Sequence, residues 1–81
     1  MKTIDVKKKF EKQIFEVSNY FRELRYAENL SQAEIGIETG LHRNTIFNVE
    51  NSKNFTLLTL FQLCDFYQIS ESELLSIYNK S

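Results

Sequence analysis

The sequence contains no proline, no tryptophan, two glycines and one cysteine. The turns of a small β-sandwich or barrel depend on proline and glycine, so their scarcity favours helices joined by short connections. The lone Cys64 excludes a disulfide framework and a zinc site built from several cysteines. No apolar run approaches the length of a membrane span, and no signal-peptide pattern opens the chain. We therefore expect a cytoplasmic protein with no membrane partner.

Neither sign of charge dominates, because 10 Lys and Arg stand against 11 Asp and Glu. This balance argues against tight and indiscriminate binding to a polyanion. The length of 81 residues allows one small domain, spanning residues 1–81, and leaves no room for a separate effector domain. We therefore expect no small-molecule effector.

An extended first helix is predicted by a stripe of apolar residues that recurs at steps of four and three from Phe10 to Leu24. We place this helix from about Val6 to Ala27. Phe15 and Tyr20 fall off the stripe, so they are expected to be exposed. A run of lysines, Lys7–Lys9, stands at the start of the helix, where such a run is more often solvated than bound to flanking phosphates.

Hydroxyl side chains mark the starts of three further helices. Ser31 and Ser70 each stand three residues before a glutamate, which is the pattern of a capping box. Thr56 can cap the helix that comes directly before the one opened by Ser70. The predicted inward face of that helix consists of Leu57, Leu60, Phe61, Cys64 and Tyr67, with Cys64 as an inert core residue.

The stretch 32–51 reads QAEIGIETGLHRNTIFNVEN, which is typical of two helices that meet across a tight turn. Gly36 supplies the small residue where the second helix crosses the first. Gly40 supplies the residue that takes a positive φ in the turn. The second helix is expected from residue 42 or 43 to about residue 51, and apolar side chains hold the pair together: Ile35, Leu41, Ile46 and Val49.

These segments resemble the phage-repressor-like (Cro/Xre-type) helix-turn-helix family. The resemblance covers about Phe21 to Ile77 and includes the stretches LSQAEI, TGLHRNTIFNVE and TLLTLFQLCDFYQIS. It implies an all-α, compact five-helix, lambda-repressor-like domain that binds double-stranded DNA with its third helix in the major groove. Restriction–modification controller proteins, and small repressors of phages and mobile elements, look similar to this chain. A helical hairpin of a structural bundle remains the alternative.

Roles for individual residues follow from this resemblance. It implies that Gln32 touches a phosphate, and that Arg25 and Glu50 form an ion pair between the first and third helices. The chain departs from the family at Thr39, where many relatives have an apolar residue. It departs again at two positions where many relatives have glycine, Ser52 and Gln68.

The composition of the third helix indicates DNA binding independently of the resemblance. At 100° per residue, Asn44, Asn48 and Asn51 lie on the side of this helix opposite its predicted buried side, although asparagine is a poor helix former. Asparagine can bind adenine, arginine can bind guanine through two hydrogen bonds, and an aromatic ring can lie on a thymine methyl group. Together with the resemblance, this pattern predicts the base contacts Arg43, Asn44, Thr45, Phe47 and Asn48. The resemblance also implies contacts to the DNA backbone, and the predicted set is Gln32, His42, Asn51, Lys53 and Asn54. The alternative is that Phe47 packs on a neighbouring helix and the asparagines merely tolerate solvent.

Few cationic side chains accompany these positions, so we expect a homodimer on two half-sites one helical turn apart. The predicted dimer residues, which could instead complete the core, are Leu74, Leu75, Ile77 and Tyr78; Phe15 and Tyr20 form a second candidate patch.

An enzyme is not expected, because the one histidine lies in the DNA-facing segment and no phosphate loop, metal-ligand cluster or cofactor motif is present. The rival function is a protein-interaction module, similar to an antitoxin.

Overall fold

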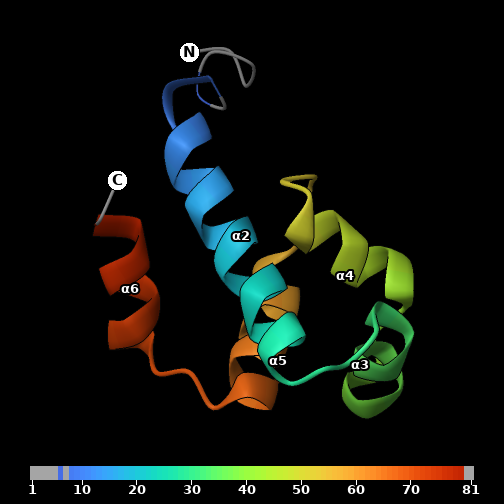
Figure 1. The fold of residues 1–81 in the computed structure, drawn as a ribbon. Coiled ribbons are helices and arrows are strands. Elements are labelled where there is room, and N and C mark those ends of the chain that lie inside the picture. Colours follow the sequence, from blue (N-terminus) through green and yellow to red (C-terminus); the bar gives the residue numbers. More distant parts are fainter. Residues whose placement is uncertain (1–5, 7, 80–81) are drawn as a thin grey trace.

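The computed structural model describes residue 6 and residues 8–79, and for residues 71, 78 and 79 it describes the main chain alone. In this part of the chain five α-helices follow one another: α2 (Glu11–Ala27), α3 (Gln32–Thr39), α4 (Arg43–Glu50), α5 (Leu57–Tyr67) and α6 (Glu71–Asn79) (Figure 1). This confirms the all-α fold. Within the described residues, no helix is both long and apolar enough to cross a membrane.

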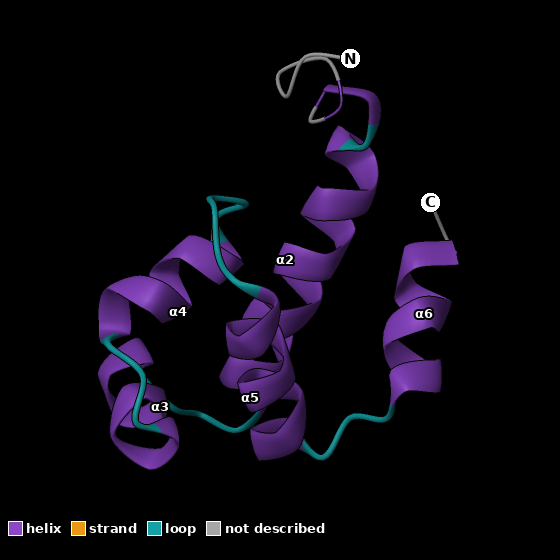
Figure 2. Cartoon of the chain, turned by 180° about the vertical axis from the view of Figure 1, so that it is seen from behind, coloured by secondary structure: helices purple, strands orange, loops and turns teal. Residues whose placement is uncertain are grey.

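The helices pack in pairs around α2 and α5. The long α2 runs beside α6 in the opposite direction, so that the start of α2 and the end of α6 lie on the same side of the molecule (Figure 1). α3 packs against α4 through the tight turn, while α2 contacts α4 and α3 contacts α5. Seen from behind, α5 stands between α4 and α6, with the loop from α4 descending into its first turn (Figure 2). α4 thus lies at one side of the molecule, with its outer face free.

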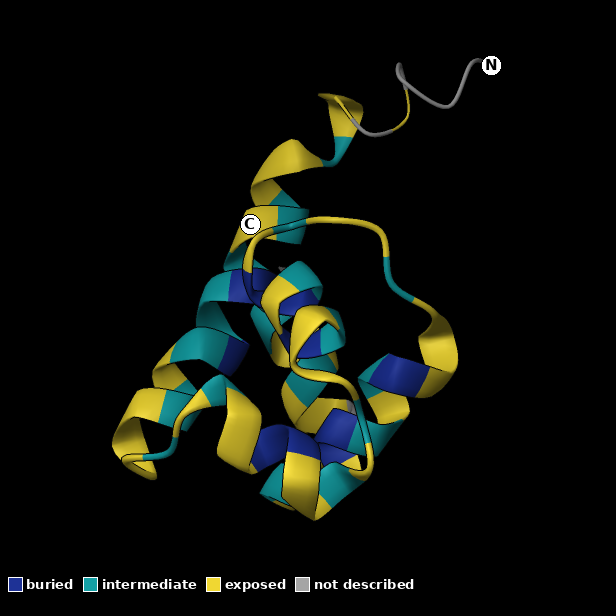
Figure 3. Ribbon diagram, turned by 90° about the vertical axis from the view of Figure 1, so that its right-hand side faces the viewer, coloured by how far each residue is buried: buried dark blue, intermediate teal, exposed yellow. Residues whose placement is uncertain are grey.

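The core draws at least one side chain from each of α2, α3, α4 and α5. Phe21 of α2 is 1% exposed and Ile35 of α3 is fully buried, and both meet the inner face of α4. Figure 3 shows buried stretches of the ribbon, coloured dark blue, on several of the helices. The remaining buried apolar residues are Ile46, Val49, Leu63 and Cys64.

Side-chain caps start three of the helices, as the sequence predicts. The Ser31 hydroxyl accepts a hydrogen bond from the Glu34 amide at 3.1 Å, and the Glu34 carboxylate accepts one from the Ser31 amide at 2.9 Å. The hydrogen bond that the Ser31 amide donates to this carboxylate, with a smaller contribution from the Ser31 side chain, holds the pKa of Glu34 below its ordinary value. Thr56 accepts from the amide of Thr59 at 3.1 Å. The same arrangement opens α6, where the Ser70 hydroxyl accepts from the amide three residues later at 3.2 Å.

Helical structure appears from Val6 onward among the described residues, as predicted, but it is interrupted at Phe10. Phe10 takes φ −107° and ψ 17° and provides no side-chain cap, so α2 itself begins at Glu11. The placement of Tyr20 differs from the prediction. Phe15 is 54% exposed, as expected. Tyr20 is only partly exposed, which the sequence analysis had wrong. Its ring lies edge-on to Phe21 at a centroid distance of 5.9 Å, and burial raises the pKa of its hydroxyl.

The inward face of α5 is also partly wrong in the sequence prediction. Leu57 and Phe61, which were expected inside, are 64% and 50% exposed. Thr59 and Leu63 are buried instead. Because α5 carries large apolar side chains on both sides, its helical periodicity does not select one face. The rest of the predicted set lies in or against the core: Leu60, Cys64 and Tyr67.

Two positions where relatives carry glycine do adopt the conformation that glycine favours. Ser52 has φ 58° and Gln68 has φ 59°, so both lie in the left-handed region. Gln68 ends α5, and its side chain makes only an exposed 3.3 Å hydrogen bond to the Asp65 carbonyl. Ser52 differs, because its hydroxyl donates to the buried Ser18 hydroxyl at 3.0 Å.

Glycine at these two positions is therefore expected to have different effects on stability. Q68G removes backbone strain and should raise the free energy of unfolding by about 0.5–1 kcal/mol. S52G relieves similar strain but leaves the Ser18 hydroxyl without its partner, which costs about 1–3 kcal/mol, so no gain is expected. Urea denaturation of both variants measures this difference. Equal gains from the two substitutions would contradict the role given to the Ser18–Ser52 hydrogen bond.

Candidate nucleic-acid interface

The turn between α3 and α4 is tight because of its two glycines. A Cβ atom on Gly36 would lie 2.6 Å from the Leu41 carbonyl oxygen, so a larger residue would push the turn away from α3. Gly40 ends α3 at φ 78°. Thr39, at the position that is apolar in many relatives, donates its hydroxyl to the Ile35 carbonyl at 2.7 Å and accepts from the Leu41 amide at 3.2 Å. The threonine thereby satisfies polar groups at the turn.

The outer face of α4 carries most of the predicted base contacts. Arg43 and Asn44 are exposed, and Phe47 is 43% exposed even though it is large and aromatic. Thr45 and Asn48 are only partly exposed, so they lie at the flanks of this face rather than at its centre. Ile46, Val49 and Glu50 are the buried side. The structure thus has Phe47 directed outward and not packed into the core.

His42 has a role that the sequence analysis did not identify. It is the N-cap of α4, and its Nδ1 atom accepts a hydrogen bond from the Asn44 amide at 3.0 Å. An imidazole that accepts at Nδ1 carries its proton on Nε2 when it is neutral. The exposed ring therefore fixes the first turn of α4 with one nitrogen and presents an N–H donor with the other.

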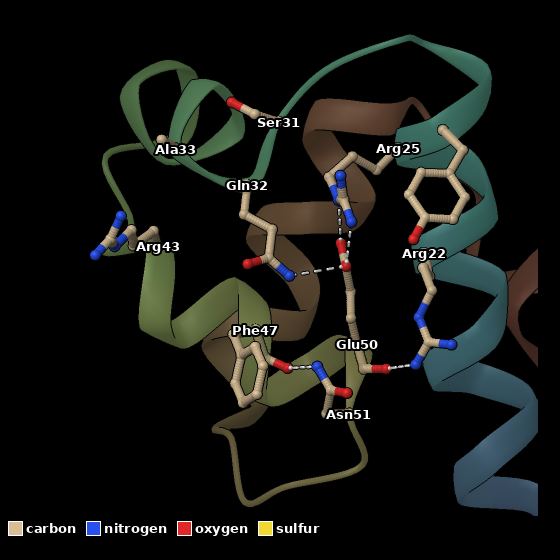
Figure 4. A pocket seen from close by; sticks show the side chains of 10 residues that line it. Arg22, Arg25, Ser31, Gln32, Ala33, Arg43, Phe47, Glu50 and Asn51 are labelled. Carbon is tan, nitrogen blue, oxygen red and sulfur yellow. Dashed lines mark hydrogen bonds and ion pairs between the residues drawn. The ribbon is translucent and has the colours of Figure 1, made fainter.

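A buried ion pair fixes the far end of α4 to α2, as the resemblance implied. The guanidinium of Arg25 donates to both carboxylate oxygens of Glu50, at 2.8 and 2.9 Å, and the Gln32 side chain adds a third hydrogen bond at 3.1 Å (Figure 4). Glu50 is 2% exposed. The hydrogen bond to Glu50 raises the pKa of Arg25 above its ordinary value. Beside this pair, burial raises the pKa of Tyr67 to about 12, so its phenol stays neutral.

Two further residues of α2 join this site without having been predicted. Arg22 donates to the main-chain carbonyl of Glu50 at the C-terminal end of α4 (Figure 4). Tyr26 is 61% exposed, and the guanidinium carbon of Arg25 lies 4.8 Å from its ring centroid. Spacings of three and four residues put Arg22, Arg25 and Tyr26 on one side of α2. That spacing is visible in the sequence and could have revealed them.

These side chains surround an open hollow of about 640 Å³ between α2, the start of α3 and α4. Arg22, Arg25 and Arg43 line it, while Glu50, already paired, is the only acidic residue among its lining. The first turn of α3 also faces it. The capping box uses the amides of Ser31 and Glu34, which leaves those of Gln32 and Ala33 to bind an anion, where the helix dipole favours negative charge. We call this the arginine hollow.

The predicted backbone contacts lie around this hollow and beyond the end of α4. Gln32 and Asn51 line the hollow, although each already makes one hydrogen bond within the protein. For Asn51 this bond runs from Nδ2 to the Phe47 carbonyl at 2.8 Å. Lys53 and Asn54 are exposed in the following loop. The structure therefore brings the α4 residues, Gln32 and Asn51 to one surface, with the two loop residues at its edge.

The predicted dimer residues on α6 do not form a single exposed patch. Leu74 packs against the core, because α6 folds onto α2 within the same chain. Ile77 is partly exposed, and Leu75 is 60% exposed. The side chain of Tyr78 lies outside the described residues. Of the predicted α6 residues whose side chains are described, Leu75 is the most exposed, and Phe15 of the second patch is exposed as well.

Within the described part of the chain, no group of three or more His, Cys, Asp or Glu residues could hold a metal ion. Cys64 is buried, and burial raises the pKa of its thiol, which disfavours the reactive thiolate. The predicted inert role of this cysteine is consistent with that environment.

Comparison with known proteins identifies the family. A helix-turn-helix family model matches residues 21–74, which is two thirds of the chain and runs from the middle of α2 into α6. Neither curated proteins nor solved structures give a match to the chain. The matched region contains the whole helix-turn-helix, both glycines of its turn and the Arg25–Glu50 pair. The chain therefore belongs to the Cro/C1-type helix-turn-helix family of DNA-binding regulators, the phage-repressor-like proteins.

Proposed function

We propose that the protein is a transcriptional regulator that reads a specific duplex sequence by placing α4 in the major groove. The observation that carries this proposal is the outer face of α4. Arg43, Asn44 and Phe47 are exposed there, while the opposite side is buried and held to α2 by Glu50. Such a face suits base recognition, because arginine matches guanine, asparagine matches adenine and an aromatic ring can contact the thymine methyl group.

The arginine hollow supplies the contact that orients α4 in this proposal. A phosphate seated there would meet the guanidinium groups of Arg22 and Arg43, the Gln32 side chain and the free amides at the start of α3. Phosphate contacts of this kind fix the register of a protein on DNA but carry no sequence information. The Nε2–H donor of His42 and the exposed Lys53 and Asn54 would bind further phosphates.

The regulator is proposed to act as a homodimer on an approximately palindromic operator. One copy presents a single arginine on the outer face of α4, so two half-sites one helical turn apart supply the affinity that one cannot. Leu75 is an exposed apolar residue of α6 and is proposed to lie in the dimer contact. Activation and repression differ only in where the operator lies relative to the promoter. The site of action is the compartment that holds the DNA.

Selection of bound duplexes from a random pool tests the proposal. We expect enrichment of an inverted repeat that contains A·T pairs and at least one contacted G·C pair in each half-site. The enriched repeat should lose affinity when its A·T pairs are exchanged one at a time. Recovery of a pool without sequence preference, from protein whose helical content is intact, would overturn the proposal.

A protein-interaction module, similar to an antitoxin, is the second candidate function. The observation that favours it is the apolar outer surface of α5, where Leu57, Leu58 and Phe61 are all at least half exposed. Single exposed apolar residues are ordinary, but three on adjacent turns of one helix are typical of an interaction surface. Tight capture of one protein, with no duplex enriched by selection, would favour this function over the first.

A further inference from the structure

A second hollow, of about 690 Å³, lies between the N-terminal part of α2 and the loop that follows α4. Three lysines, Lys8, Lys9 and Lys12, line it together with Ser52 of that loop. Glu11 is the only acidic residue among its lining. Within the described residues, none of the three ammonium groups has a carboxylate partner at ion-pair distance. We call this the lysine hollow.

The lysine hollow and the arginine hollow are each lined by one of two consecutive residues of the chain. Asn51 lines the arginine hollow and Ser52 lines the lysine hollow, so the turn after α4 separates them. The hydrogen bond between Ser52 and the buried Ser18 fastens this turn to α2 at 3.0 Å. The two hollows are therefore held in a fixed relation by α2.

The distance between the two groups of cations suits the spacing of a DNA backbone. Lys12 and Arg22 are ten residues apart on one continuous helix, which corresponds to about 15 Å along its axis. One DNA strand carries about one phosphate per 3.4 Å of helix axis, so this length matches about four phosphates. The two groups of basic side chains thus lie at different parts of α2, with Arg22 near the recognition helix and Lys12 near the start of α2.

We propose, on the basis of the proposed function, that the lysine hollow binds the phosphates of duplex DNA beyond the base pairs that α4 reads. Three ammonium groups that line one hollow repel one another, and a bound phosphate backbone would offset that repulsion. The ammonium of Lys9 lies 5.6 Å from the ring centroid of Phe10, and this cation–π contact restricts the conformation of the Lys9 side chain. The contact adds affinity and footprint without adding sequence specificity.

The salt dependence of binding to the selected duplex tests this site. Each phosphate contact contributes about 0.9 to the slope of log K against log salt, so the triple variant K8Q/K9Q/K12Q should reduce the slope by about 2–3 per subunit. The matched variant K8R/K9R/K12R keeps the charges and should keep the slope. On a duplex trimmed to the bases that α4 reads, the glutamine variant and the unchanged protein should bind equally.

The outcomes separate this inference from the proposed function. An unchanged slope in the glutamine variant, with specific binding intact, overturns the lysine site and leaves the function standing. Binding by the unchanged protein without sequence preference overturns base recognition, and a reduced slope in the glutamine variant then still supports the lysine site. Because the three lysines are exposed, the variant is expected to fold, which its circular dichroism spectrum verifies.

Discussion

Replacement of Arg25 by alanine is expected to lower the free energy of unfolding by about 3–5 kcal/mol. The reason is the position of Glu50, which is 2% exposed and receives both of its short ionic hydrogen bonds from Arg25. Without the guanidinium, a buried carboxylate keeps only the hydrogen bond from Gln32. Arg25 also donates to the Leu30 carbonyl at 3.0 Å, so the connection between α2 and α3 loses a contact as well. Urea denaturation followed by circular dichroism measures the loss.

The loss of stability in R25A should arise because the buried Glu50 carboxylate is left without its ionic partner, rather than because the attraction between the two charges is lost. The double variant R25M/E50M, which removes both charges and keeps apolar volume, should therefore recover much of the stability that R25A loses. R25K keeps the charge but lacks the planar fork, so it should fall between the unchanged protein and R25A. A loss below about 1 kcal/mol in R25A, as for an exposed ion pair, would contradict this account.

A domain of this size has about 5–15 kcal/mol of stability in total, so R25A would lose a large part of it. The consequence reaches the recognition surface, because Glu50 is the last residue of α4 and Arg22 also binds its carbonyl. Both ends of α4 are held by polar contacts, His42 at the start and Glu50 at the end. A rigid α4 is what base recognition requires, since positions must be held within a fraction of an ångström.

The features that sequence reasoning predicted are those controlled by nearby residues. The serine and threonine caps depend on a hydroxyl and an amide within three residues, and all three form as expected. Gly40 takes the left-handed conformation because no Cβ opposes it. The Arg25–Glu50 pair spans 25 positions and came from the family resemblance alone. Local physical chemistry has no means of finding such a distant partner.

The features that sequence reasoning missed have physical reasons too. The outer face of α5 was misassigned because Leu57, Leu58 and Phe61 are as apolar as the residues inside, so periodicity has two solutions. Arg22 was missed because its partner is a main-chain carbonyl, and every residue has one. His42 was taken for a DNA contact alone, since histidine is less common as an N-cap than serine, threonine, aspartate or asparagine.

Alanine at Arg43 or at Asn44 is expected to reduce discrimination at one base pair each while leaving the fold intact. Each well-made contact to a base pair is worth about 1–3 kcal/mol, so R43A should reduce preference for one G·C pair by about 5- to 150-fold, and N44A should do the same at one A·T pair. Both residues are exposed. Alanine is also the better helix former at each position, so weaker binding would not result from a weaker α4.

Two control variants test whether a loss of binding comes from a lost base contact. One keeps the positive charge at Arg43, and the other removes an asparagine that lies outside α4. R43K keeps the positive charge but cannot form the paired hydrogen bonds to guanine, so it should retain the salt slope and lose discrimination at the G·C pair. N19A removes an asparagine from α2, where its side chain binds Glu23 in solvent, and should leave affinity unchanged. Competition between the selected duplex and single base-pair exchanges measures all four variants. If R43A and N44A weaken binding to every duplex equally, these side chains contact phosphates and the bases are read elsewhere; a loss confined to one base pair for each variant identifies the pair that each residue reads.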